Sequence, residues 1–293
     1  MPTRVLQPAR SDIWQEANDL FFKHFRLDPS ARGPLFLQQL VSSFGRLPYE
    51  NLSKIIRSRE EKDPVDWFRL PAEVMKDHVE HRLGGTCFSL TFFLERLLIC
   101  TGFNCYKVMA HMRAGENIHC AAIVRLPEGD VLIDPGYGLN RPVALSKDRP
   151  VRFVSRHGGV ELVFDPEDER FHLFTYMAQE RKWRYCFTNE PVSDEEFERH
   201  WIASFSKSSM SNVCLYRASH HGHLYLRKNH LRITSFRGQR KENVRESLDK
   251  TVETYFGIAP HWVEEARGIL AERRAAWQKR NGENDSSWEG AFS

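Results

Sequence analysis

Three residues in this chain have side chains suited to acyl transfer: Cys87, His119 and Asp134. A thiol, an imidazole and a carboxylate can act together. The imidazole removes the proton of the thiol, and the carboxylate orients the imidazole. Each residue alone also has a plain structural interpretation, as a small buried thiol, a histidine at a strand end and an aspartate that begins a turn. Taken together, and with the cysteine behind a Gly-Gly pair, they favour a papain-like triad in the order Cys, His, Asp.

The element that must position Cys87 is a helix. Leucines at 90, 94, 97 and 98 have the i, i+4, i+7, i+8 spacing of one helix face, and further apolar residues broaden that face. We therefore expect a helix buried on most sides that ends near Gly102. A cysteine in its first turn lies at the positive end of the helix dipole, which favours the thiolate over the thiol.

His119 and Asp134 belong to a predicted hairpin. Ile118–Leu126 has the composition of a strand, Glu128–Gly129 of a tight turn, and residues 131–134 of the returning strand. This register puts His119 and Asp134 on the same face of the sheet, but about 13 Å apart along it, which is too far for a hydrogen bond. A longer loop or a slipped register would bring the two side chains together, and the sequence leaves both arrangements open.

The rest of the chain is predicted to be of the α+β class. Helical patterns fill the first hundred residues, apart from Arg57–Asp66, which we interpret as an exposed loop. One of the predicted helices runs from about Pro71 to His81 and leads into the Gly-Gly bend. Short alternating segments between Cys105 and Phe187 predict an antiparallel sheet or small barrel. A short helix, three strands and two helices follow, and the polar residues 281–293 are expected to be disordered.

Composition excludes several classes of protein. The 293 residues carry 42 basic and 39 acidic side chains, a net charge of +3, so the chain is no polyelectrolyte. Glu95 and Arg96 interrupt the longest apolar run, and the N-terminus lacks the apolar core of a secretory signal. Six cysteines occur without a CxxC pair. We expect a reduced, cytoplasmic protein with no membrane or nucleic-acid partner.

Two local features suggest ligand sites. Residues 227–245 contain seven basic side chains and one acidic one, Glu242, a patch that could attract phosphates or form an ordinary solvated surface. His220, His221 and His223 resemble a metal cluster, but neighbouring strand residues face opposite sides and no cysteine or carboxylate completes the set. We therefore expect no metal.

Several motifs together resemble those of the arylamine N-acetyltransferases. They are Leu47-Pro48-Tyr49-Glu50-Asn51-Leu52, Gly84-Gly85-Thr86-Cys87-Phe88, Gly102-Phe103, His119 and Asp134-Pro135-Gly136-Tyr137-Gly138. The resemblance extends from about residue 18 to residue 258 and is strongest between residues 47 and 138.

The resemblance implies a three-part fold. It consists of a helical bundle with the nucleophilic cysteine (1–102), a β-barrel with the histidine and aspartate (103–192) and an α/β lid (193–280), followed by the tail. It also implies ping-pong transfer. Cys87 would take an acetyl group from acetyl-CoA and pass it to an arylamine, hydrazine or N-hydroxyarylamine, with His119 and Asp134 completing the triad.

The resemblance and the composition also suggest residues for the binding of CoA and of the aromatic amine. The segment with Ser206 and Ser209 lies where the family contacts CoA, and Gly115 precedes His119 in a loop. Phe88 and Phe103 could line an apolar pocket for an aromatic amine, although such residues are more often core.

Two departures from the family pattern stand near the nucleophile. Leu83 replaces the usual Arg before the Gly-Gly pair, and Ser89 replaces a Glu two residues after the cysteine. The missing Arg would leave Glu50 without its partner, and the acyl donor could be longer or carboxylated. Two other classes stay open: a cysteine hydrolase of the thioesterase or transglutaminase kind with the same triad, and a binding protein with a degraded site.

Overall fold

A computed structural model describes residues 11–60, 63–155, 158–177, 180–207, 210–219, 222–235 and 238–281. The first part of the chain is helical, as predicted, with short segments that the sequence did not reveal. Its elements are α1 (Ser11–Phe25), α2 (Gly33–Phe44), β1 (Tyr49–Glu50), α3 (Leu52–Glu60), the 3-10 helix η2 (Pro64–Trp67), α4 (Pro71–His81) and α5 (Cys87–Cys100).

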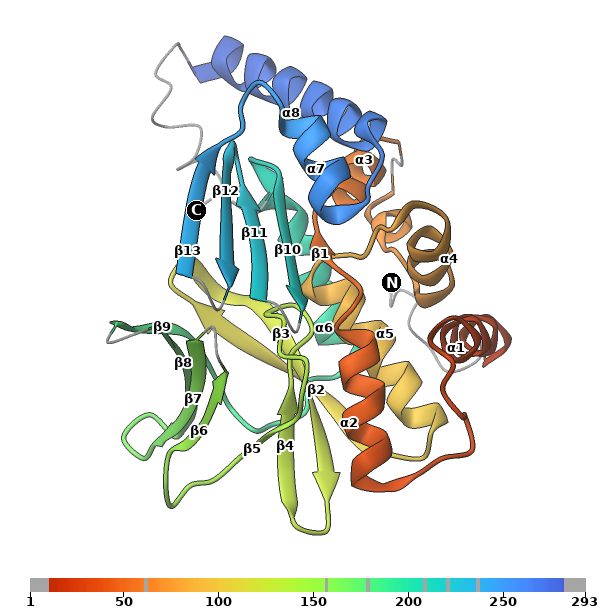
Figure 1. The fold of residues 1–293 in the computed structure, drawn as a ribbon, viewed down its shortest axis with the longest axis vertical. Coiled ribbons are helices and arrows are strands. Elements are labelled where there is room, and N and C mark those ends of the chain that lie inside the picture. The colour runs from red at the N-terminus through yellow and green to blue at the C-terminus, as the bar shows by residue number, and fades with distance from the viewer. Residues whose placement is uncertain are drawn as a thin grey trace.

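The middle of the chain forms an eight-stranded antiparallel sheet with the order β5-β4-β3-β2-β9-β8-β7-β6. The end strands of this order, β5 and β6, contact each other, so the sheet curls into a nearly closed, barrel-like shape (Figure 1). The strands are β2 (Asn104–Met112), β3 (Gly115–Leu126), β4 (Gly129–Ile133), β5 (Val143–Ala144), β6 (Val151–Ser155), β7 (Gly158–Asp165), β8 (Arg170–Met177) and β9 (Glu180–Phe187).

The last part of the chain adds a second antiparallel sheet with the order β1-β10-β11-β12-β13 and several helices. Its first strand, β1, comes from the N-terminal part, so the helical region and the C-terminal region share a sheet. The elements are α6 (Asp194–Ala203), the 3-10 helix η3 (Ser204–Ser206), β10 (Cys214–Ser219), β11 (Gly222–Arg227), β12 (His230–Ser235), β13 (Gly238–Asn243), α7 (Leu248–Phe256) and α8 (Pro260–Asn281).

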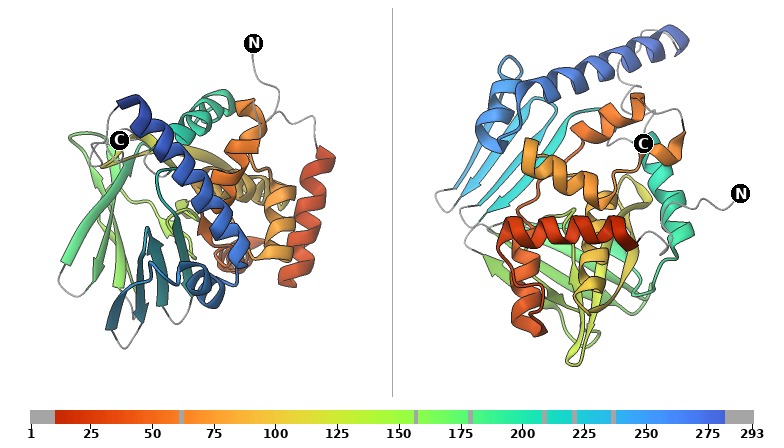
Figure 2. Two further views of the ribbon diagram at one scale, coloured as in Figure 1. Left: turned by 90° about the horizontal axis from the view of Figure 1, so that it is seen from above. Right: turned by 90° about the vertical axis from the view of Figure 1, so that its right-hand side faces the viewer.

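Helix α5 is the structural centre of the molecule. Its side chains enter two hydrophobic clusters: Leu90, Leu94 and Leu97 pack with α1 and α2, whereas Phe88 and Phe92 pack towards α6. Figures 1 and 2 show the N-terminal helices on one side of the two sheets, with α8 crossing the end of the molecule beside α7. A helix that is apolar all round must be enclosed in this way, which confirms the prediction from its leucine spacing.

Three expectations about elements change. The charged segment expected as a loop begins in α3, because Leu52, Ile55 and Ile56 are buried on one helix face. The basic stretch after residue 237 forms the edge strand β13. Helix α8 ends at Asn281, and the remainder of the expected tail lies outside the described residues.

None of the helices in the described ranges combines the length and the apolar character needed to cross a bilayer.

Candidate active site

Cys87 is the first residue of α5 and is only 7% exposed. The bend before it is held by the Leu47–Leu52 motif: the Gly85 N–H donates to the Pro48 carbonyl (3.2 Å), and the Glu50 N–H donates to the Gly85 carbonyl (3.0 Å). A Cβ on Gly84 would lie 1.8 Å from the Pro48 oxygen, so only glycine permits this approach. The two motifs therefore meet in space to place the cysteine.

His119 and Asp134 meet in a direct hydrogen bond. The imidazole Nε2 lies 2.7 Å from Asp134 Oδ2, and both side chains are buried. The Tyr185 hydroxyl donates to the same carboxylate oxygen (2.6 Å), and the Tyr137 N–H donates to Oδ1 (2.7 Å). Because three donors hold the carboxylate, its orientation towards the imidazole is fixed.

The expected separation of His119 and Asp134 is corrected by the register of the hairpin. Leu126 pairs with Gly129, so the loop is Pro127–Glu128, one residue earlier than predicted. This shift reduces the stagger between the two side chains while leaving them on the same face. Strand β4 also ends at Ile133, so Asp134 leaves the ladder and can turn towards His119.

The loop after Asp134 packs against Cys87. A Cβ on Gly136 would lie 2.6 Å from the Cys87 Cβ and 3.2 Å from His119 Cε1, so a side chain at residue 136 would collide with Cys87 and crowd His119. The Leu139 N–H donates to the Asp134 carbonyl (2.9 Å), which helps to fix this loop. The His119 and Cys87 side chains interact, and because Nε2 is engaged by the carboxylate, Nδ1 is the ring nitrogen left for the thiol.

The electrostatics of the pair favour a charged thiolate and imidazolium. The pKa of Cys87 lies well below its ordinary value, because a hydrogen bond from Cys120 to the sulfur and the charge of His119 lower it by more than burial raises it. For His119, burial lowers the pKa, but the Asp134 carboxylate and the Cys87 thiolate outweigh this effect and raise the pKa to about 10. A thiolate is thus favoured at neutral pH.

Cys87 opens into a large cavity of about 1340 Å³ between the two sheets and the helices. This volume exceeds the range of about 300–1,000 Å³ typical of small-ligand sites. Among the described lining residues, the only acidic one is Glu180, which is paired with Lys182 at 2.8 Å. The basic ones are Lys54, Arg113, Arg141, Lys182, Arg184, Lys207, Arg227 and Arg232. The cavity therefore suits a large ligand with several negative charges.

Of the residues expected to bind the amine or CoA, some line this cavity and others do not. Phe88 lines the cavity. Phe103 instead stacks on Phe36 with ring centroids 6.4 Å apart, in the cluster under α2. Gly115 begins β3 beside the lining residues and Ser206 is exposed, but neither belongs to the described cavity wall. Ser209 lies outside the described residues.

The expectation that Glu50 lacks a partner is wrong. Arg69, which precedes α4 and is 4% exposed, places Nη1 at 3.3 Å from the Glu50 carboxylate. The same nitrogen donates to Ser53 Oγ (2.5 Å) and to the Gly84 carbonyl (2.6 Å), and Nη2 donates to Asp77 (2.6 Å). The guanidinium thus arrives from a different segment than expected, while Leu83 is an apolar core residue.

Sequence reasoning missed three contributors to the site: Tyr185, Arg69 and Cys120. Tyr185 and Arg69 come from segments far from their partners, and no local pattern marks them. Cys120 had a usable signal, because it follows His119 in a strand and must face the opposite side, towards α5. It is fully buried in the same cluster as Cys87.

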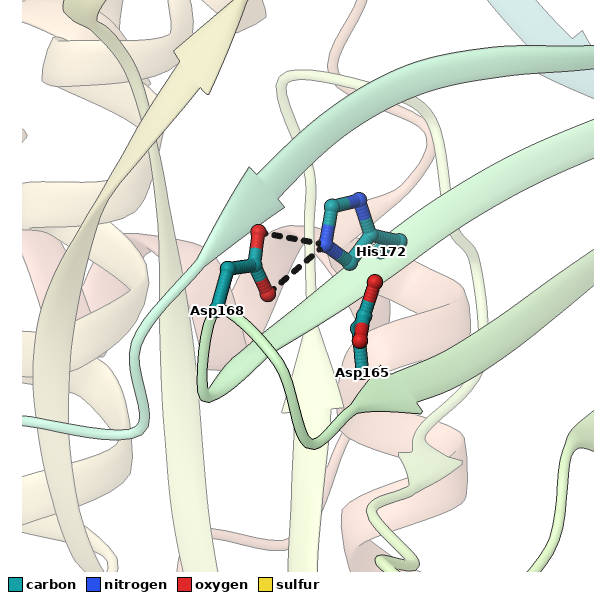
Figure 3. Close-up of side chains that lie close together, drawn as sticks. All are labelled: Asp165, Asp168 and His172. Atoms are coloured by element: carbon teal, nitrogen blue, oxygen red, sulfur yellow. Dashed lines mark hydrogen bonds and ion pairs between the residues drawn. The ribbon is translucent and has the colours of Figure 1, made fainter.

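A second polar cluster lies at the turn between β7 and β8. Figure 3 shows His172 directed at Asp168, with Asp165 beside them; their ligand atoms lie within 4.8 Å of one another. The indole N–H of Trp183 donates to His172 Nδ1 (3.0 Å), so Nε2 carries the proton and donates to Asp168 (3.0 Å). Because a metal at Nε2 would need that proton removed, we interpret the cluster as a hydrogen-bonded pair. Of the three histidines whose spacing argued against a metal cluster, His220 and His221 lie outside the described residues.

Comparison with known proteins identifies acetyltransferases as relatives of this chain. A family model described as N-acetyltransferase matches residues 36–262. An uncharacterized acetyltransferase, YvcN of Bacillus subtilis, is 26% identical over 196 residues, which are 62% of this chain and 72% of YvcN.

Solved structures share the fold at lower identity. The arylamine N-acetyltransferase from Mycobacterium abscessus is similar with a TM-score of 0.73 and 18% identity, over 90% of this chain and 99% of that one. The enzyme from Salmonella typhimurium gives a TM-score of 0.71 and 18% identity, over 87% and 98%. The enzyme from Bacillus cereus, described as having a Cys-His-Glu triad, gives 0.65 and 18%, over 83% and 98%.

Proposed function

Because this chain belongs to the arylamine N-acetyltransferase family, we propose that it transfers an acyl group from an acyl-CoA, in the simplest case acetyl-CoA, to a small aromatic amine or hydrazine through an acyl-cysteine. The observation that supports this proposal best is the buried arrangement of Cys87, His119 and Asp134 at one wall of the large cationic cavity. The positive charges of that cavity complement the phosphates of CoA.

In the first half-reaction the Cys87 thiolate attacks the thioester carbonyl. The tetrahedral oxyanion needs hydrogen-bond donors, and the first N–H groups of α5 have no acceptor within the helix. The Cys87 N–H is the nearest candidate. Collapse of the intermediate breaks the bond to the CoA sulfur, and the His119 imidazolium supplies the proton that the leaving thiolate takes.

In the second half-reaction the amine attacks the acyl-cysteine. His119, now neutral, takes a proton from the attacking nitrogen, and the Cys87 thiolate leaves as the amide forms. Asp134 stabilises the imidazolium that this step regenerates. Because Cys87 is buried except towards the cavity, a substrate that fills the cavity limits the access of water to the acyl-cysteine, which favours aminolysis over hydrolysis.

The direct test is the intact mass of the protein after mixing with acetyl-CoA, for the native chain and for Cys87→Ala. We expect a gain of one acetyl group on the native chain alone, and its loss when an aromatic amine is added. Loss of the adduct without amine would identify a hydrolase instead. If neither acetyl-CoA nor longer acyl-CoAs modify the protein, the binding-protein interpretation replaces this one.

A further inference from the structure

Lys54 is a buried cation in the wall of the cavity that contains Cys87. It lies in the first turn of α3 and is only 5% exposed. Lys54, Ser204 and Lys207 line the cavity together with Thr86 and Cys87. An ammonium group at such a position is notable because a buried charge is costly unless it is paired.

The contacts of Lys54 hold its nitrogen without neutralising it. Nζ donates to Ser204 Oγ (2.5 Å), whose own proton goes to the Trp201 carbonyl (2.5 Å). Nζ also lies 4.2 Å from the centre of the Phe205 ring, within the range of a cation–π contact. An ammonium has three N–H donors, so one remains after these two contacts with described residues.

No carboxylate lies within 4.0 Å of this ammonium in the part of the chain that the structure describes. Burial lowers the pKa of Lys54 to about 8, and the opposing influences come from Cys87 and Cys120 rather than from an acidic side chain. The Cys87 thiolate is thus the nearest negative charge identified for Lys54.

The catalytic cycle proposed above removes that negative charge. When Cys87 becomes acylated, its sulfur is part of a neutral thioester, and Lys54 then faces the cavity without an anion. Lys207, on the same wall, adds a second positive charge. An anionic group on the ligand would supply the missing charge where the ammonium is already desolvated and held in place.

We propose that Lys54 selects for a carboxylate on one of the two substrates, so that the favoured reaction involves a carboxylated acyl group or a carboxylated aromatic amine. This inference rests on the proposed function. A carboxylate accepts the free N–H of Lys54 as a charge-assisted hydrogen bond, whereas a neutral substituent leaves that donor unsatisfied. The two sources of carboxylate differ in the half-reaction that they affect.

The test compares charged and neutral substrates of similar size in the full chain. For the donor, we compare succinyl-CoA with butyryl-CoA by the rate at which intact mass shows acylation of Cys87. For the acceptor, we compare 4-aminobenzoate with 4-methylaniline by the rate at which they discharge the acyl-enzyme. Lys54→Met keeps most of the side-chain length and removes the charge.

A matched control is Lys182→Met, since Lys182 lines the same cavity but is half-exposed and already paired with Glu180. In the native chain we expect the charged substrate to be preferred in one of the two comparisons. Lys54→Met should lower that charged-to-neutral ratio at least about tenfold, and Lys182→Met should leave it within about twofold. The comparison in which the ratio falls identifies the substrate that carries the carboxylate.

Unchanged ratios in Lys54→Met, in a variant that still becomes acylated, would overturn the inference while leaving the proposed function intact. Absence of acylation by any acyl-CoA would instead refute the proposed function. In that case, thermal unfolding in the presence of 4-aminobenzoate or succinate tests whether Lys54 binds a carboxylate. Stabilisation of the native chain but not of Lys54→Met supports carboxylate binding, and equal behaviour of the two proteins refutes it.

Discussion

Replacing Arg69 by methionine should strongly destabilise this protein, because it leaves a buried carboxylate without its counter-ion. Glu50 is fully buried. Of its side-chain contacts within the described residues, it would keep those from Ser53, while the contact from Arg69 at 3.3 Å would be lost. Removing one partner of a buried ion pair costs roughly 3–5 kcal/mol. The second partner, Asp77, is 21% exposed and can be hydrated, so it adds little.

We therefore expect Arg69→Met to lower the free energy of unfolding by roughly 3–5 kcal/mol, a large share of the 5–15 kcal/mol typical of a domain. Urea denaturation followed by circular dichroism measures this change as a lower midpoint with the same slope. The matched control is Arg57→Met. Arg57 also pairs with a glutamate, Glu73, at 3.3 Å, but both side chains are about 30% exposed. Its loss should cost less than about 1 kcal/mol.

A double substitution tests the cause of this loss. If the penalty comes from an unpaired carboxylate, Glu50→Gln in the Arg69→Met background should recover part of the stability, since it removes the orphaned charge. A double variant as unstable as the sum of the two single variants would refute this reasoning. So would an Arg69→Met variant that loses less than about 1 kcal/mol.

Three further predictions concern the thiol and the cations near it. Asp134→Asn removes the group that raises the pKa of His119 to about 10, so acyl transfer should fall about 10²–10⁴-fold. The rate of iodoacetamide labelling of Cys87 should be constant through neutral pH in the native chain and should rise with pH in the variant. An unchanged labelling profile would contradict the thiolate–imidazolium pair. Cys120→Ala removes the hydrogen bond that contributes most to the low pKa of Cys87. The labelling profile should shift to higher pH, whereas Cys120→Ser, which keeps a donor, should shift it less; equal profiles for the two variants would exclude this role. Lys54→Met should raise the free energy of unfolding by up to roughly 3 kcal/mol at pH 7, because burial lowers the pKa of Lys54 from 10.5 to about 8. Below pH 8 the lysine is charged in both states and the full cost applies; between pH 8 and 10.5 only the unfolded chain keeps the proton, so the native protein gains stability and the difference shrinks. Urea denaturation of both proteins at several pH values measures the difference in the free energy of unfolding. A difference that does not change with pH would refute a lowered pKa of Lys54.

Local patterns predicted the elements that carry the chemistry. The leucine spacing identified α5, and Pro71 with the residues after it gave α4 with the bounds that the structure has, Pro71–His81. These predictions succeed because helix periodicity and a proline at a helix start are properties of neighbouring residues. The meeting of His119 with Asp134 could be proposed but not decided, since a shift of one residue in the turn changes the stagger of the whole hairpin.

Contacts between distant segments could not be predicted in this way. Strand β1 has only two residues, and it is a strand because Tyr49 pairs with Tyr216 in β10. Nothing near residue 49 in the sequence encodes that partner. The same holds for Arg69, whose guanidinium replaces an expected neighbour of the Gly-Gly pair, and for Tyr185, whose hydroxyl reaches Asp134 from β9. In each case the interaction depends on the tertiary fold, which one sequence does not display.

Lys54 differs from two other buried cations, Arg69 and Lys107, in how its charge is compensated. Arg69 contacts the carboxylates of Glu50 and Asp77. Lys107, which is 3% exposed, likewise contacts two carboxylates, those of Glu95 at 2.6 Å and Asp194 at 2.8 Å. Both cations join separate elements of the fold, and each has its charge compensated within the protein.

Lys54 is as buried as these two, yet no carboxylate of the described chain lies within 4.0 Å of it. Besides its contacts with η3, it lines the cavity. If its role were only to join α3 to η3, a methionine would fill the same space without the cost of a buried charge. Proteins are only marginally stable, so a destabilising group of this size is most readily explained at a site where activity needs it. The position of Lys54 in the wall of the cavity that contains Cys87, rather than its contacts with Ser204 and Phe205, is therefore the reason to look for its counter-ion on the substrate.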